Sequence, residues 1–143
     1  MLKTIKLKSI DHDGLGYGDG DWEVDSNGNL KYLEGPQAVE QNVVKMIHTR
    51  LQSWGYGTVL HDLIGSKNKS ATVAAALYSA KKGLEFLAWI QARHTQLQAM
   101  ELSERLGKEL RVIAEPSDQS IILTATIETA DGAGQEVGAV VEE

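Results

Sequence analysis

Alternation of apolar and polar residues near the C-terminus is the feature that most constrains the fold of this 143-residue chain. Residues 120–129 alternate with a period of two and are rich in β-branched side chains. Successive side chains of a β-strand point to opposite faces, so this pattern predicts a strand with one buried face. Turns expected at 115–118 and 130–134 separate it from strands expected at 110–114 and 137–141. Together these segments predict an antiparallel sheet.

Helical periodicity begins at about Gln37 and continues to about Trp54. Apolar side chains recur three or four residues apart there, which is the spacing of a stripe along one face of an α-helix. Gly55 is a suitable end for this helix, because glycine readily adopts the conformation that terminates helices. The short apolar segment 58–65 then predicts a strand or a single helical turn packed on the sheet. The stripe consists of Val39, Val43, Ile47, Leu51 and Trp54.

A second helical pattern extends from Ala71 to about Leu106, with Ser70 as the expected N-cap. Gly83 lies inside it and leaves open whether the segment is one helix or two. We expect its apolar stripe, which consists of Leu, Met, Trp and Phe86 along residues 77–106, to belong to the core rather than to a ligand pocket. The stripe also contains Leu77, Leu84, Leu87, Ile90, Leu97, Met100 and Leu106. The expected solvated face carries Lys81, Lys82, Arg93, Gln96, Glu101, Glu104 and Arg105.

The N-terminal region combines a strand pattern, a loop and a hairpin signal. Residues 2–10 alternate basic with apolar residues, which predicts a strand that pairs with another segment or another chain. Residues 11–21 hold four glycines and four aspartates, so we interpret residues 1–20 as an arm and a Gly/Asp-rich loop. Asn27-Gly28 lies between the alternating halves of 22–32 and predicts a hairpin, because this dipeptide tolerates the positive φ angles of a type I′ turn.

Helices in the middle with hairpins on either side predict an α+β fold: an N-terminal hairpin, two or three helices and a C-terminal antiparallel sheet. We expect residues 1–143 to form a single domain. The chain has no cysteine, so disulfides and Cys-ligated metals are excluded, as is typical of a reducing cytoplasm. Its net charge of −6 argues against a nucleic-acid partner. We also expect no signal peptide and no membrane partner, since no apolar run approaches about 20 residues.

Two candidate metal sites are weak on chemical grounds. One is a match to positions 1, 3, 5, 6 and 12 of a calcium-binding EF-hand loop, but such a loop begins with Asp and is flanked by helices rather than by alternating segments. The other would use the histidines, of which no two stand at i, i+4 spacing. We expect no metal and no cofactor, and keep a small calcium-binding adaptor as an alternative. The residues concerned are Glu23, Asp25, Asn27, Gly28 and Glu34, and His12, His48, His61 and His94.

Glu109, Asp118 and Thr124 follow one another at the spacing of the catalytic residues of phage-type lysozymes. A protonated and an ionised carboxylate on either side of a glycosidic bond can hydrolyse it. In the lysozyme fold a helical lobe follows this motif, whereas here about 25 strand-like residues follow Asp118. We therefore expect that the protein is not an enzyme. A peptidoglycan hydrolase that uses Glu109 and Asp118 is the alternative.

The order of features along residues 15–140 resembles the lysozyme-like baseplate wedge family of contractile phage tails (gene-25-product-like), to which a type VI secretion baseplate component is related. The family's Glu-Pro-Arg triplet matches Glu109-Leu110-Arg111, where leucine replaces the proline. Glu115-Pro116-Ser117 keeps the proline but lacks the arginine, whose planar fork can pair with a carboxylate. The other shared features are the hairpin at 21–30, a helix with Val39, Gln41 and Leu51, a turn at 55–57, the segment 62–65 and a sheet that ends at 129–132.

The resemblance implies a structural role. It implies six copies per baseplate, in a six-fold ring around the tail tube, with the C-terminal sheet presented to the first layer of the sheath. The implied partners are other baseplate wedge proteins, the tail sheath protein, and tail hub or tube proteins. The implied location is the virion tail baseplate, after assembly in the host cytoplasm. The resemblance makes Glu109, Leu110 and Arg111 the expected protein-interface residues.

Overall fold

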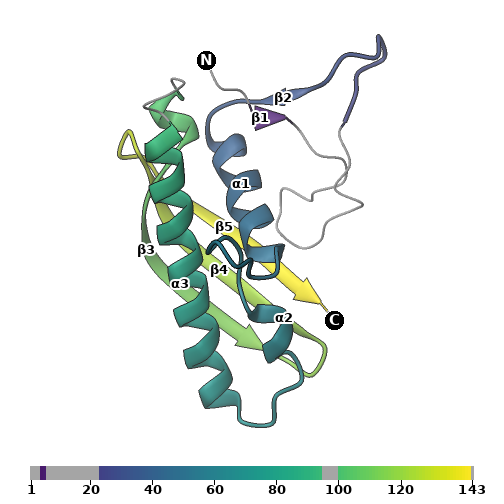
Figure 1. Ribbon diagram of the computed structural model, residues 1–143, viewed down its shortest axis with the longest axis vertical. Helices are drawn as coiled ribbons and strands as arrows, with labels where there is room; N and C mark the ends of the chain where they lie inside the picture. The colour runs from purple at the N-terminus through teal and green to yellow at the C-terminus, as the bar shows by residue number, and fades with distance from the viewer. Residues whose placement is uncertain (1–3, 6–22, 95–99, 143) are drawn as a thin grey trace.

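The computed structural model describes residues 4–5, 23–94 and 100–142. Three α-helices lie on one face of a three-stranded antiparallel sheet, and a small two-stranded sheet lies beside the start of the first helix (Figure 1). The structure thus confirms the expected α+β fold, with its N-terminal hairpin, central helices and C-terminal antiparallel sheet.

The C-terminal sheet has the strand order β3 (Leu106–Pro116), β4 (Ser120–Thr129) and β5 (Gly134–Glu142). β4 lies in the centre and has the bounds expected from its alternation, with every second residue buried. β3 and β5 are the two edge strands, and both are longer than expected. β3 includes Pro116, which an edge strand tolerates at its end because little of its outer side is hydrogen-bonded. The connecting turn therefore shortens to 117–119.

Helix α1 (Pro36–His48) begins with proline in its first turn and ends six residues before the expected end at Trp54. The chain turns away at Thr49, which is extended. Thr58 then forms a parallel bridge with Arg50, and the backbone of 49–58 closes into a loop through the bonds Leu51 N to Thr58 O (3.0 Å) and Thr58 N to Thr49 O (2.8 Å). The tertiary bridge overrides the helical spacing, because the backbone groups that would extend the helix are hydrogen-bonded within the loop.

Gly57 makes this loop possible. Its φ angle is +106°, and a Cβ atom there would lie 2.6 Å from the carbonyl oxygen of Arg50. Only glycine allows both the left-handed conformation and so close a backbone approach. The loop is thereby held close to the backbone of Thr49 and Arg50, just after α1.

Two further helices complete that layer. α2 (Leu60–Leu63) is a single helical turn, one of the two alternatives expected for segment 58–65. α3 (Lys69–His94) is continuous through Gly83, which lies where a Cβ would meet the Met46 sulfur at 2.5 Å. Asn68 rather than Ser70 caps α3, since its side-chain oxygen accepts a hydrogen bond from the backbone N–H of Ala71 (3.1 Å).

The helical pattern expected to reach Leu106 breaks down earlier. After α3 and the undescribed residues 95–99 comes a short 3₁₀ turn (Leu102–Glu104), and Leu106 already begins β3. The backbone N–H of Leu106 donates to the side-chain oxygen of Gln91 at 2.8 Å, and both residues are buried. This bond joins the end of α3 to the start of the sheet.

The N-terminal hairpin is present, with a different turn from the one expected. Val24 bridges Leu30, and Asp25 N donates to Asn29 O (2.8 Å), so three residues rather than two form the loop. Gly28 has φ +82° and adopts the left-handed position that such a loop requires. β2 (Tyr32–Leu33) then pairs with β1 (Thr4–Ile5). The rest of the strand expected at 2–10, and the loop at 11–21, lie outside the described residues.

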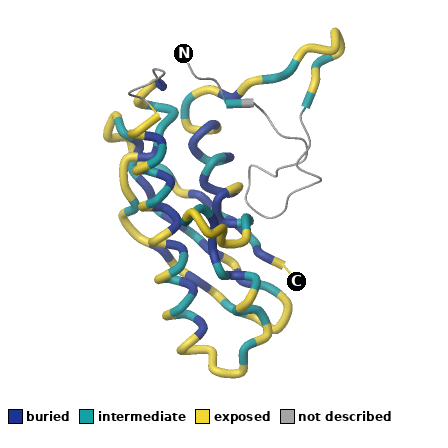
Figure 2. Tube along the Cα trace, viewed as in Figure 1, coloured by how far each residue is buried: buried dark blue, intermediate teal, exposed yellow. Residues whose placement is uncertain are grey.

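The core lies between the helices and the inner face of the sheet, where buried residues gather in both layers (Figure 2). α3 packs mainly on β3 and α1 mainly on β5, as Figure 1 shows. The opposite face of the sheet is not covered by any described element. The largest fully buried side chains include Met46, Ile47, Leu60, Leu84, Ile121, Leu123 and Ile127.

Candidate functional site

The expected interface residues Glu109, Leu110 and Arg111 form an irregularity in edge strand β3. Glu109 is paired with Ile127 and Arg111 with the adjacent Thr126, so Leu110 is one residue in excess of β4. This is a β-bulge, a device that bends a strand and redirects its side chains. Leu110 itself is exposed over 51% of its surface. A second irregularity lies between Leu106 and Lys108.

The bulge places Glu109 and Arg111 on opposite faces of the sheet. Directly paired residues of antiparallel strands share a face. Glu109 therefore lies on the face of the buried Ile127, which the helices cover, and Arg111 lies on the open face with Thr126. Residues two apart in a regular strand share one face, so the excess residue is what moves these two charges to different faces. The structure separates them.

Arg111 is exposed and has no ion pair among the described residues. Across the open face its row continues through Thr126 to Glu136 on β5. The neighbouring row is already paired, since Lys108 Nζ lies 4.0 Å from a carboxylate oxygen of Glu128. The guanidinium is therefore the basic group of this face whose donors are available to a partner's carboxylate.

Apolar side chains lie beside Arg111 on the same face. We use "open sheet face" for the outward residues Arg111, Ile113 and Glu115 of β3, Ile122, Thr124 and Thr126 of β4, and Glu136, Gly138 and Val140 of β5. Ile113 and Ile122 are exposed over 39% and 40% of their surfaces. Gly138 lies in register with Thr124 and adds no side chain to this face.

The carboxylates of the hydrolase alternative are far apart. Asp118 lies in the turn after β3, where it accepts a contact from Lys69 Nζ at 3.2 Å. Glu109 lies in the first half of β3, so roughly 20 Å separates it from Asp118 at the usual rise of a β-strand. Paired carboxylates of glycosidases lie about 5–10 Å apart. Thr124 faces the open side, whereas Glu109 faces the helices. The structure does not bring these three residues together.

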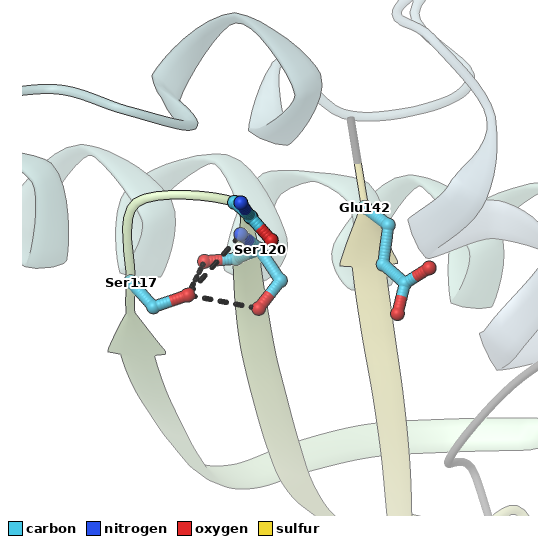
Figure 3. A pocket seen from close by; sticks show the side chains of 4 residues that line it. Ser117, Ser120 and Glu142 are labelled. Carbon is cyan, nitrogen blue, oxygen red and sulfur yellow. Dashed lines mark hydrogen bonds between the residues drawn. The ribbon is translucent and has the colours of Figure 1, made fainter.

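A polar hollow of about 480 Å³ lies near that turn, between the ends of β3, β4 and β5. Ser117, Gln119, Ser120 and Glu142 line it, and the two serine hydroxyls bond to each other at 3.0 Å (Figure 3). Glu142 is the one carboxylate among these lining residues. A single acid without a second titratable group gives no acid–base pair.

The calcium-like residues are used by the hairpin itself. The Asp25 carboxylate accepts the backbone N–H groups of Asn27 (2.8 Å) and Asn29 (3.0 Å), and Glu23 pairs with Lys31 (2.9 Å). Throughout the described part of the chain, no three His, Asp or Glu residues gather as metal ligands do. His12 lies outside the described residues.

Two histidines that are distant in sequence lie together. His61 Nε2 is 2.9 Å from the carbonyl oxygen of His48, at the junction of α1 and α2. Burial, and secondarily the positive charge of His61, lower the pKa of the His48 imidazole from 6.5 to about 4. The ring is therefore neutral at physiological pH, and the pair acts as a packing contact.

Sequence reasoning missed an aromatic surface. Trp54 and Tyr56 from the loop stack at 5.4 Å, and Phe86 of α3 contacts Trp54 at 5.8 Å and Trp89 at 5.7 Å. Trp54 was expected in the first helix, and Phe86 and Trp89 in the core stripe of the second. Instead, Trp54 and Trp89 are exposed over 58% and 55% of their surfaces. The signal that could have indicated this surface is the spacing Tyr78, Lys82, Trp89, Arg93 along one helical face.

Comparison with known protein families, curated proteins and solved structures yields no match for this chain. Within the described residues, none of the helices has the length and apolar character needed to cross a membrane.

Proposed function

We propose that this protein is a structural subunit of a phage tail baseplate wedge that starts or anchors the sheath of a contractile tail. The observation that carries the proposal is the edge strand β3, whose bulge turns Arg111, which forms no ion pair with any described residue, onto the open face of the sheet. The proposal combines this geometry with the sequence resemblance described above. It assigns no catalytic residue and no cofactor to the chain.

The edge of β3 supports a role in assembly. An edge strand presents unpaired N–H and C=O groups, onto which a strand of another chain can add. The bulges interrupt the first half of β3, but pairing is regular from Val112 to Pro116. The regular half can therefore extend the sheet, while the bulges restrict indiscriminate pairing along the other half.

Arg111 supports a specific rather than a general contact. Its guanidinium offers donors in a planar fork that matches a carboxylate, and charge-assisted hydrogen bonds of this kind are about twice as strong as neutral ones. Leu110 protrudes next to it and adds apolar area to the same contact. The matching residues of the family's Glu-Pro-Arg triplet would thus divide their roles: Leu110 and Arg111 face a partner, and Glu109 faces the helical layer.

The proposed assembly contains six copies in a ring around the tail tube. Its partners are other baseplate wedge proteins, the sheath protein, and hub or tube proteins. The location is the virion baseplate, after assembly in the host cytoplasm. The separation of Glu109 from Asp118 favours this role over the hydrolase alternative, because the two acids cannot flank one glycosidic bond.

The decisive experiment is tail assembly with Arg111 variants. The chain is expressed with the tail proteins encoded beside it, and tails are counted by electron microscopy. We expect Arg111→Ala to fold normally and to abolish or strongly reduce tails with attached sheath, and Arg111→Lys to restore them only in part, because an ammonium cannot form the bidentate pair.

Lys67→Ala, an exposed basic residue outside the sheet, is the matched control and should assemble as wild type does. Sheathed tails at wild-type frequency with Arg111→Ala would overturn the proposed role of this residue. Glu109-dependent release of muropeptides from peptidoglycan by the purified protein would overturn the proposed function in favour of the hydrolase.

A further inference from the structure

We propose that copies of this chain bind one another head to tail: the aromatic surface of one copy receives the end of the open sheet face next to the β3–β4 turn of the next copy, around Ile122 and Val140, which leaves Arg111 to the partner proposed above. We call that surface the aromatic groove; it consists of Leu51, Trp54 and Tyr56 of the loop and Tyr78, Phe86 and Trp89 of α3. The inference deepens the proposed function and rests on it only for the number of copies, since it names the surfaces through which copies would meet.

The groove has the character of a docking site. Between the loop and α3 lies a hollow of about 300 Å³, lined almost entirely by apolar atoms of residues such as Leu51, Val59, Ala75, Tyr78 and Gly83. Tyr78, Trp54, Trp89 and Leu51 are exposed over 67%, 58%, 55% and 52% of their surfaces, the four highest values among large apolar residues in the described part of the chain. Contiguous exposed apolar surface of this kind marks an interaction site.

The aromatic side chains of the groove pack on one another. Trp54 and Tyr56 stack with an interplanar angle of 11°, and Phe86 holds Trp54 edge-on. Gly55 lies against the Phe86 ring, where a Cβ would be only 3.0 Å away. Burial raises the pKa of Tyr56 to about 12, so its phenol remains neutral and adds no charge to the floor. A preorganised aromatic surface loses little conformational entropy on binding.

Charge indicates which occupant the groove prefers. α3 carries four Lys or Arg residues and one Glu, although the whole chain has a net charge of −6. Lys82 lies 5.7 Å from the centre of the Tyr78 ring, and Arg93 lies 5.5 Å from that of Trp89. The exposed aromatic rings are thus bordered by cations, one of which also contacts Glu85 at 3.8 Å. An apolar surface with acidic neighbours is the complementary partner.

The open sheet face of the same molecule has that chemistry. Ile113, Ile122 and Val140 form its apolar part. Glu115 lies in the row of Ile122 and Val140, and the exposed Glu142 lies at the adjoining end of β5. Residues 106–142 carry seven acidic and two basic residues, the reverse of the balance on α3. The aromatic groove and the open sheet face therefore both have an apolar centre. The charged residues beside the groove are basic, and those beside the apolar part of the sheet face are acidic.

The geometry requires a head-to-tail contact. α3 lies between the groove and the sheet, so the two surfaces are on different sides of one molecule and cannot meet within it. A two-fold contact of groove with groove would place Lys82 and Arg93 against their own copies, which is repulsive. A heterologous contact instead repeats from copy to copy, and gives a ring if it closes or a filament if it does not.

Self-association of purified protein tests the inference without any tail component. Sedimentation velocity of the wild type over a range of concentrations should show association that weakens as salt is raised. Reversal of the groove charges (Lys82→Glu with Arg93→Glu) and reversal of the sheet charges (Glu115→Lys with Glu142→Lys) should each weaken association about tenfold or more. Tyr78→Ala should weaken it without affecting the thermal melting curve, because the side chain is exposed.

Two measurements make the result specific. The groove-reversed and sheet-reversed variants should associate with each other when mixed, because each then offers the charges that the other lacks. Lys67→Glu, a charge reversal on neither surface, should associate as wild type does. A wild type that stays monomeric at about 1 mM, or sheet reversal without effect on association, would overturn the inference. Neither result would bear on the Arg111 test, which uses a different residue and a different readout.

Discussion

At the residue scale, several side chains behave as their environment dictates rather than as their type suggests. Asp25 looks like a calcium ligand, but its carboxylate accepts two backbone N–H groups of its own turn. Arg111 looks like the partner of Glu109, but one extra residue places it on the other face of the sheet. His48 looks like a scattered histidine, and burial beside His61 keeps it neutral. Each outcome depends on which neighbouring polar groups need a hydrogen-bond partner.

His48 provides a pH test. Its pKa is about 4 in the folded protein and 6.5 in the unfolded chain, so between these values only the unfolded chain binds the proton. The free energy of unfolding should therefore fall as pH falls through this window, by about 1–2 kcal/mol after allowance for the ring's partial exposure to solvent. Above pH 6.5 the group makes no pH-dependent contribution.

Urea unfolding at pH 7 and pH 4.5 measures this effect. His48→Gln should show a smaller loss of stability between the two pH values than the wild type does, whereas His94→Gln, an exposed histidine, should match the wild type. Carboxylates titrate similarly in all three proteins, so the difference between variants isolates His48. Equal losses in wild type and His48→Gln would contradict the assignment.

At the element scale, the edge strand is regular in one half and bulged in the other. Val112 to Pro116 alternates inward and outward as β4 does, because the core fixes Val112 and Ala114 on the inner face. Before Val112, β3 contains two residues more than the segment of β4 with which it pairs, and these excess residues bend the strand. The core thus fixes the register of β3 next to the turn, whereas the half of the strand nearer Leu106 accommodates excess residues.

Deletion of Leu110 tests this description. Removing the excess residue leaves Glu109 facing inward and Arg111 outward, so we expect the variant to fold with a melting temperature close to that of the wild type. Deletion of Ile113 removes a residue from the regular half and shifts the register by one, which would turn apolar inner residues outward. We expect that second variant to lose cooperative unfolding.

Thermal melting followed by circular dichroism distinguishes the two deletions. A Leu110 deletion that unfolds as readily as the Ile113 deletion would show that the bulge is required for the fold. A folded Leu110 deletion should also aggregate more readily, since a flatter edge strand is a better template for pairing with other copies.

At the scale of the whole molecule, a helical layer covers one face of the sheet, and no element in the described part of the chain covers the other. The covered face contains the buried residues of all three strands, and the basic α3 lies over β3. The molecule is therefore asymmetric in charge, with basic residues over the helices and acidic residues over the sheet. This asymmetry is the basis of both proposals: a partner extends the edge of β3, and another copy covers the open face.

The attachment of the two layers can be tested at Gln91, whose side-chain oxygen accepts the buried N–H of Leu106 at 2.8 Å. Gln91→Leu leaves that N–H without its acceptor and should lower the free energy of unfolding by about 1–3 kcal/mol. For a chain of this size we expect a melting temperature lower by roughly 3–10 °C. Gln119→Leu, in the exposed turn, is the control and should melt within about 2 °C of the wild type. Equal melting of the two variants would contradict a role for Gln91 in joining the layers.

The sequence by itself determined the elements that depend on local pattern. The alternation of 120–129 predicted β4 with its observed bounds, because the β-strand is the regular secondary structure whose side chains repeat every two residues. The positions of the hairpin, the connector turn and the helical middle followed from Asn-Gly, from apolar content and from 3.6-residue spacing. The α+β class followed from their order along the chain.

Only the tertiary structure decided where the elements end and what their surfaces present. Leu51 and Trp54 continue the helical spacing, yet the bridge of Arg50 to Thr58 draws them into a loop and exposes them. Gly83 would weaken an isolated helix but is needed where α3 meets Met46. The bulge at Leu110 exists only relative to β4. Each depends on a partner distant in sequence, and pairing between distant segments leaves no periodic signal in either one.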